Sequence, residues 1–264
     1  MPKAARVKSA MEFVPIQIWT TGLVFARLGA IFMLAPGIGD SSVPPRVRLL
    51  LALFVAAIIT PLVSGKLPPM PDTNTGLFLG IGAEVLIGLA IGTVLRTIFS
   101  ALATAGSIAG MQTGLSFAMT MDPTQGSQGA IFGAFLAVIG TTLVMQTNLH
   151  HWFIVGTINS FDFMSSNPQS ALWAFKAGPS ATWILTSFSK AFLLAMQITA
   201  PLILYGVIYN VAIGIINRAA PAIQVFFIAQ PIQVVVGLFL FMITSGAGML
   251  IWLEAMSKTA QDLG

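Results

Sequence analysis

Long stretches with little or no formal charge divide this chain into candidate helices. A helix that spans a lipid bilayer requires about 20 mostly apolar residues. Such stretches cover residues 13–35, 49–65, 76–95, 97–121, 123–161, 191–217 and 219–253. Strict alternation of apolar and polar positions, which would indicate membrane strands, does not occur in them. The pattern predicts an all-α protein with six or seven mostly long helices.

Proline and glycine mark the expected breaks between these helices. Clusters of proline, glycine and small polar residues predict loops at 37–45, 66–75, 122–129 and 165–180. The stretch at 219–253 is too long for one straight span. Pro221 and Pro231 are therefore expected to break it into shorter helices or a hairpin.

Composition favours a polytopic membrane protein. Hydrophobic residues make up 56% of the 264 residues and charged residues only 8%, whereas a soluble domain carries about a quarter charged residues. No hydrophilic stretch is long enough for a separate soluble domain, so residues 1–264 are predicted to form a single helical membrane domain. The basic tail formed by Lys3, Arg6 and Lys8 is typical of a membrane-helix flank, and no nucleic-acid partner is expected. The apolar stretch after this tail is longer than a signal-peptide core, which predicts an uncleaved first helix.

Glycines recur at every fourth position in several of the predicted helices. The longest series is Gly106, Gly110 and Gly114, and shorter steps are Gly76/Gly80, Gly88/Gly92 and Gly129/Gly133. Residues four apart share one helix face, and glycine lets a second backbone approach closely. The pattern fits packing within one chain, and it also fits packing against other subunits.

The segment from Met111 to Met121 mixes glycine, hydroxyl groups and methionine. Methionine is flexible and fills irregular gaps, which would suit a seal that opens and closes again. A plain helix end, stopped by Asp122 and Pro123, explains the same composition. The composition alone favours the plain helix end.

Arg27, Glu84 and Arg96 are ionisable residues in or near apolar helices. Such groups are costly in lipid and normally have a partner or reach water. A structural ion pair between Arg27 and Glu84 is the expected arrangement. The alternative is a proton or ion relay, but relays usually contain several acidic groups or histidines and Glu84 is nearly alone.

Enzyme signatures are weak in this sequence. Residues 37–40 read Gly-Ile-Gly-Asp, the GxGD pattern of intramembrane aspartyl proteases, but that chemistry requires a second carboxylate. Ser116 with His150 and His151 faintly resembles a serine–histidine dyad and lacks the glycine expected after the serine. The chain has no cysteine, HExxH motif, phosphate-binding loop or dinucleotide fingerprint. We expect no catalytic activity, cofactor or metal.

Several blocks together resemble the FliR family, the R-type export-gate proteins of flagellar type III secretion. The blocks are Phe25-Ala26-Arg27, Ala35-Pro36, Val43 to Arg48, Glu84 to Gly92, Gly106 to Ala118 with Asp122-Pro123, Asn217 to Pro221, Phe226 to Pro231 and Gly237. The resemblance covers residues 13–253, and the central glycine-rich block is the most specific. The basic tail and the pair His150-His151 depart from the pattern that the family would lead us to expect.

The resemblance implies a helical export-gate assembly around a pore for unfolded flagellar proteins. Residues 11–170 would be similar to a P-type subunit and residues 181–255 to a Q-type subunit. The family's pore plug maps onto the central block, on Gly106, Gly110, Met111, Gly114, Leu115, Ser116, Phe117, Met119 and Met121.

The resemblance also implies partners and a location. The partners would be P-type and Q-type subunits, a B-type export switch protein, unfolded secreted substrates and membrane lipid. The location would be the bacterial inner membrane at the flagellar basal body, with the assembly projecting towards the periplasm. The equivalent subunit of a virulence injectisome is an alternative, although the block from Gly114 to Pro123 favours the flagellar system. A small-solute secondary transporter is another, but no convincing repeat relates the two halves of the chain.

Overall fold

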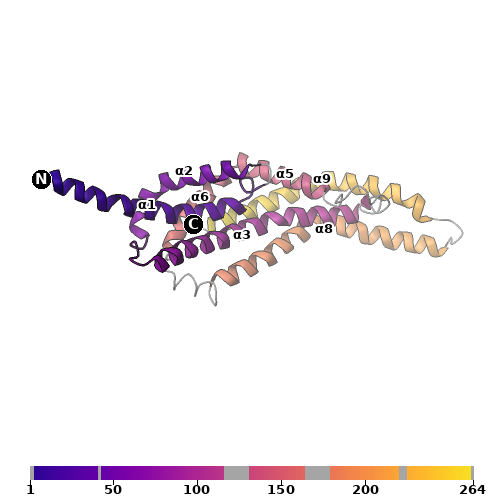
Figure 1. Cartoon of the computed structure of the whole chain (residues 1–264). Helices are drawn as coiled ribbons and strands as arrows, with labels where there is room; N and C mark the ends of the chain where they lie inside the picture. The colour runs from indigo at the N-terminus through magenta and orange to yellow at the C-terminus, as the bar shows by residue number, and fades with distance from the viewer. Residues whose placement is uncertain (1–2, 41–42, 116–130, 164–178, 220–224, 263–264) are drawn as a thin grey trace. The chain divides into compact units, whose positions relative to one another are not determined.

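The computed structural model describes residues 3–40, 43–115, 131–163, 179–219 and 225–262, and the regular structure in these ranges is helical (Figure 1). The α-helices are α1 Lys3–Leu34, α2 Pro45–Val63, α3 Asn74–Gln112, α5 Ile131–Gln146, α6 Leu149–Phe163, α8 Pro179–Ala219 and α9 Val225–Asp262. A short 3-10 helix, η1, covers Ser64–Lys66. The prediction of an all-α protein with six or seven mostly long helices is confirmed for the described residues.

Five of these helices are long and apolar enough to cross a membrane, and α5 with α6 would make a sixth span if the pair is counted as one. The polytopic helical membrane class is therefore confirmed. A short break separates α5 from α6. Asn148 in this break has a φ of 57°, a left-handed conformation that asparagine tolerates better than most residues. No charge marks this break, which is why the charge pattern left residues 123–161 undivided.

The expectation that Pro231 breaks the last helix is wrong. α9 runs through Pro231 to Asp262, and Pro15, Pro61 and Pro201 likewise lie inside helices. Proline is tolerated in membrane helices where neighbouring groups satisfy the backbone polar groups around it. On α8, Tyr205 and Tyr209 donate to the carbonyls of Gln233 and Ala229, so they hold α9 on either side of Pro231. Neither is the carbonyl of Phe227, which loses its helical donor because proline has no amide hydrogen. Pro221 lies outside the described residues.

A second difference concerns α3, which joins two of the predicted helices. The charge of Arg96 suggested a boundary between residues 95 and 97, but the helix continues through it. Arg96 is exposed and pairs with Asp40. An outward-pointing arginine does not interrupt helical hydrogen bonding, so one charge is a poor boundary signal.

Contacts divide the chain into two compact units. Unit 1 comprises Met1–Arg96, Asn148–Ser187 and Lys258–Gly264, and unit 2 comprises Thr97–Thr147 and Phe188–Ser257. This partition does not test the predicted division into a P-like part at 11–170 and a Q-like part at 181–255, which stays a prediction.

Unit 1 is built on the packing of α1 against α2 and α3. α1 and α2 lie side by side in Figure 1, and α2 also contacts α6. Glycines allow α3 to approach α1 closely. A Cβ on Gly88 would collide with the carbonyl of Arg27, and one on Gly92 would lie 2.9 Å from Cβ of Leu34. This glycine step serves packing within the chain, one of the two uses that its spacing allowed.

Unit 2 is held by close helix contacts and by aromatic side chains. A Cβ on Gly106 of α3 would collide with the backbone of Gly133 on α5. Trp252 of α9 is fully buried, and its Nε1 donates to the carbonyl of Ile98 at 3.1 Å. The Phe132 and Phe241 rings meet edge to face at 4.6 Å between centroids. Gly106 and Gly133 therefore also serve intrachain packing.

Candidate functional site

The structure brings Arg27 and Glu84 together inside unit 1. Arg27 Nε of α1 donates to Glu84 Oε2 of α3 at 2.5 Å, and both side chains are 0% exposed. Arg27 Nη1 also donates to Ser160 Oγ of α6 at 2.9 Å. The guanidinium carbon lies 3.8 Å from the centroid of the Phe161 ring, also on α6. One cation thus joins three helices.

The chemistry of this cluster favours a structural role. Opposite charges in contact neutralise each other, which reduces the penalty of burying each one. Arg27 also contacts the Ser160 hydroxyl and the Phe161 ring, both of which are uncharged. Glu84 Oε1 is buried without a hydrogen-bond partner in the described structure. We therefore propose that the pair acts as a structural clamp between helices.

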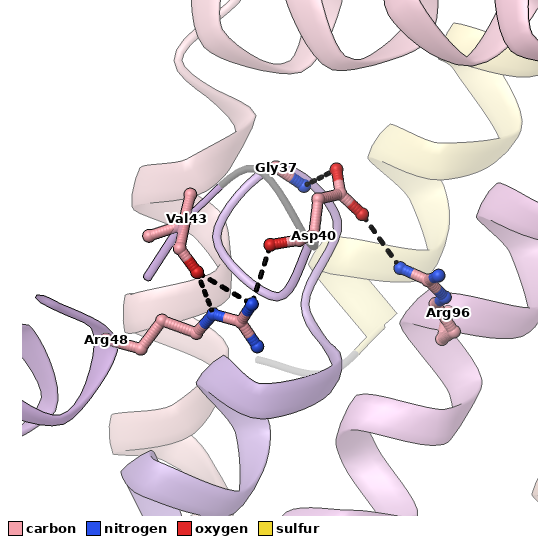
Figure 2. Close-up of polar contacts among 5 residues, drawn as sticks. All are labelled: Gly37, Asp40, Val43, Arg48 and Arg96. Atoms are coloured by element: carbon pink, nitrogen blue, oxygen red, sulfur yellow. Dashed lines mark hydrogen bonds and ion pairs between the residues drawn. The ribbon is translucent and has the colours of Figure 1, made fainter. Parts of the chain in front are cut away.

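Asp40 organises the loop between α1 and α2 (Figure 2). Its Oδ2 accepts from the Gly37 amide at 3.1 Å, and its Oδ1 accepts from Arg96 Nη1 of α3 at 2.9 Å. Gly37 has a φ of 85°, a conformation that glycine adopts without strain. From the first turn of α2, Arg48 donates to the carbonyls of Asp40 and Val43. The loop is therefore attached to both α2 and α3.

This geometry gives the GxGD motif a structural explanation. An aspartyl protease requires two carboxylates that share a proton, whereas Asp40 pairs with a guanidinium and a backbone amide. The other enzyme-like motif is not testable here because Ser116 lies outside the described residues. The rings of His150 and His151 lie 4.2 Å apart at the start of α6.

The predicted plug residues fall at the C-terminal end of α3. Gly106 and Gly110 lie in the helix and are buried, and Met111 is 69% exposed. Leu115 is half-buried just after the turn at Thr113 and Gly114. Four of the predicted plug residues lie outside the described residues, namely Ser116, Phe117, Met119 and Met121.

The expectation that Gly114 continues the glycine series on one helix face is wrong. α3 ends at Gln112, and Gly114 has a φ of 71° in the turn that follows. Glycine commonly ends helices because it adopts this left-handed conformation without strain. The four-residue spacing did not reveal the helix end, because the sequence does not distinguish a glycine that packs against another helix from a glycine that ends a helix.

The structure adds two glutamines that our sequence analysis missed. Gln230 Nε2 of α9 donates to the Gly114 carbonyl at 3.0 Å, and Gln233 Nε2 donates to the Gln112 carbonyl at 3.1 Å. Both side chains therefore hold the backbone where α3 ends. A signal for them existed, because they are polar residues within the long apolar stretch at 219–253, and polar groups in membrane helices usually bond across helices.

These features define a polytopic helical membrane protein whose buried polar groups join separate helices. Residues 18–259 match the family described as "Bacterial export proteins, family 1", so the chain belongs to this family. The relative named "Flagellar biosynthetic protein FliR" in Caulobacter vibrioides is 39% identical over 238 residues, which cover 90% of this chain and 93% of the relative.

Relatives with the same name occur in other bacteria. The protein of Escherichia coli K12 is 31% identical over 81% of this chain and 79% of its own length. That of Bacillus subtilis 168 is 27% identical over 84% of both chains. The resemblance to the FliR family is confirmed.

Proposed function

We propose that this chain is a core subunit of the flagellar protein-export apparatus in the bacterial inner membrane. In this role it forms part of a gated pore through which unfolded flagellar proteins pass. The observation that carries the proposal is the family match over residues 18–259, together with relatives aligned over most of both chains. The flagellar names of these relatives favour this system over a virulence injectisome, and no described feature favours a small-solute transporter.

The proposed partners are P-type and Q-type gate subunits, and the B-type export switch protein is a further proposed partner. Exposed apolar side chains support the idea that this chain is covered by lipid or by other subunits. On α8, Leu204, Ile208, Val211 and Ile215 are 57–65% exposed. Apolar surface of this extent is favourable only when lipid or protein removes it from water. The assembly is proposed to sit at the flagellar basal body and to project towards the periplasm.

The proposed role is structural rather than catalytic, with a plug in the segment that begins at the end of α3. The proposed plug residues are those named above, from Gly106 to Met121. Phenylalanine and methionine side chains can close a pore because an apolar constriction excludes water and ions. Substrates would pass when this segment moves aside.

Co-purification tests the proposed assembly. We expect the chain to be unstable when it is expressed alone. With P-type and Q-type subunits of the same genome it should survive detergent extraction as one complex. A stable and monodisperse protein obtained without partners, which does not bind those subunits when they are added, would contradict the proposal.

Conductance measurements test the proposed plug. Phe117→Ala, or deletion of residues 115–118, should make cells permeable to ions or small dyes while the complex still assembles. Gly110→Leu should instead lower complex yield, because bulk on a buried helix face hinders close approach. If the Phe117→Ala and deletion variants assemble normally and cells that carry them are no more permeable than wild type, this segment is not the seal.

A further inference from the structure

The C-terminal end of α3 presents backbone carbonyls that the helix itself does not satisfy. The last four carbonyls of an α-helix lack intrahelical partners and need side chains, turns or water instead. Here the Thr113 amide bonds to Ala109 and the Gly114 amide to Met111. The carbonyls of Gln112 and Gly114 accept hydrogen bonds from the glutamines of α9.

The spacing of the two glutamines suits this task. Gln230 and Gln233 are three residues apart on α9 and share one helix face. The carbonyls that they hold are two residues apart across a turn. Because a carbonyl can only accept, each glutamine must present its NH2 group to it. A side chain without a donor at these positions would leave a carbonyl without its partner.

Glycines on both neighbouring helices allow the turn to lie so close. A Cβ on Gly237 of α9 would be 2.8 Å from Cα of Thr113. A Cβ on Gly206 of α8 would collide with the side-chain amide of Gln112. At Gly114 itself, a Cβ would be 2.6 Å from Gln230 Nε2. The turn therefore fits a space that side chains at these positions would fill.

Two tyrosines of α8 keep α9 in the register that the glutamines require. Tyr205 donates to the carbonyl of Gln233 at 3.2 Å, and Tyr209 donates to the carbonyl of Ala229. The first acceptor belongs to Gln233 itself, and the second belongs to the residue that precedes Gln230. Sliding or rotation of α9 would break both tyrosine contacts together with the glutamine contacts.

We propose that Gln230 and Gln233 are positioning residues that fix the turn at Thr113 and Gly114, and with it the point at which the chain leaves α3. Tyr205, Tyr209, Gly206 and Gly237 support them by holding α9 in register and leaving room for the turn. The consequence for pore closure rests on the function proposed above, because the proposed plug continues from this turn. The hydrogen bonds from Gln230 and Gln233 to the turn, called the latch below, do not depend on that function.

Disulfide trapping measures the position of the turn directly. The chain contains no cysteine, so an introduced pair has no intrachain background. A Cβ on Gly206 would lie 3.6 Å from Cβ of Gln112, within the roughly 3.5–4.5 Å of disulfides. Gln112→Cys also removes the amide with which a side chain at 206 would collide. The Gln112→Cys/Gly206→Cys pair should therefore oxidise readily in the assembled complex.

The glutamine variants are then tested in this background. Gln230→Met and Gln233→Met keep the side-chain length and remove the donor. The double variant should oxidise at least fivefold more slowly at unchanged complex yield. Gln197→Met, at an exposed glutamine of the same unit, is the matched control and should oxidise at the parent rate. Gln230→Glu, with two acceptors in place of a donor, should slow oxidation as much as Gln230→Met does.

The outcomes separate the latch from the proposed plug. Oxidation within twofold of the parent in the double Met variant overturns the positioning role, whatever the conductance of the pore. Slower oxidation with raised conductance, in complexes of normal yield, supports both the latch and its effect on closure. Slower oxidation while the Phe117→Ala complex stays tight supports the latch and counts against the plug.

Discussion

The two compact units hold their helices together with different chemistry. In unit 1 an ion pair, Arg27 with Glu84, is fully buried and linked to Ser160. In unit 2 the buried polar side chains among the described residues are neutral, and they include Gln233, Thr113 and Thr199. A buried ion pair therefore joins helices in unit 1, whereas neutral side chains bond to backbone carbonyls in unit 2.

This difference has an energetic meaning. Removing one member of a buried ion pair leaves an uncompensated charge, which typically costs about 3–5 kcal/mol. Losing a neutral hydrogen bond costs about 1–3 kcal/mol when its partner stays buried. Removing one charged partner in unit 1 is therefore expected to cost more stability than removing one glutamine donor at the end of α3 in unit 2.

The largest expected effect is that of Glu84→Ala. It leaves Arg27 charged and buried, so the free energy of unfolding of the complex in mixed micelles should fall by about 3–5 kcal/mol. Asp72→Ala, at an exposed loop position, is the control and should change it by less than about 0.5 kcal/mol. The Arg27→Glu/Glu84→Arg exchange should recover part of the loss, but not all of it, because Ser160 and Phe161 are placed for an arginine on α1. An exchange no better than either single change would contradict the importance of the pair.

The next effect tests unit 2, where close contact between the backbones of α3 and α5 can be disturbed without changing a charge. Gly106→Leu forces a side chain into the backbone of Gly133 and should lower the free energy of unfolding by about 3 kcal/mol, the upper part of the overpacking range. Gly214→Leu is a matched control on α8 with open space around its Cβ. Thermal unfolding of both complexes should separate them clearly, and equal midpoints would show that the α3–α5 contact is not tightly packed.

Ser160→Ala should have an intermediate effect. It removes the hydroxyl that accepts from Arg27 Nη1 but leaves Glu84 in place. The expected loss in the free energy of unfolding is about 1–3 kcal/mol. Ser107→Ala, at an exposed position of α3, serves as the control. A loss as large as that of Glu84→Ala would mean that the hydroxyl, rather than the opposite charge, dominates the clamp.

The smallest effect is expected at the exposed pair of Lys66 and Asp162. Their side chains lie 2.7 Å apart but are 39% and 51% exposed. Asp162→Asn should therefore change the free energy of unfolding by less than about 1 kcal/mol. This change in the free energy of unfolding should become smaller when the salt concentration is raised from about 0.05 M to about 0.5 M, because salt screens exposed charges. A salt-independent loss similar to that of Glu84→Ala would abolish the distinction between buried and exposed pairs.

Much of the fold and part of the site could be predicted from the residues alone. Long neutral stretches predicted membrane helices because lipid excludes charged side chains and imposes a minimum span. Arg27 and Glu84 stood out as a possible pair for the same reason. The order of the glycine, proline and charged blocks was sufficient to indicate the family.

What the tertiary structure decided concerns partners that are distant in the sequence. Pro231 stays inside α9, where tyrosines of α8 bond to the backbone on both sides of it, and α3 ends at Gln112 rather than near Met121. Gln230 lies 116 residues from the carbonyl that it holds. The local sequence shows whether a side chain is suited to water or to lipid. A backbone carbonyl at a helix end meets a side chain from another helix only when the helices pack. Which side chain it meets depends on the shape of the whole unit.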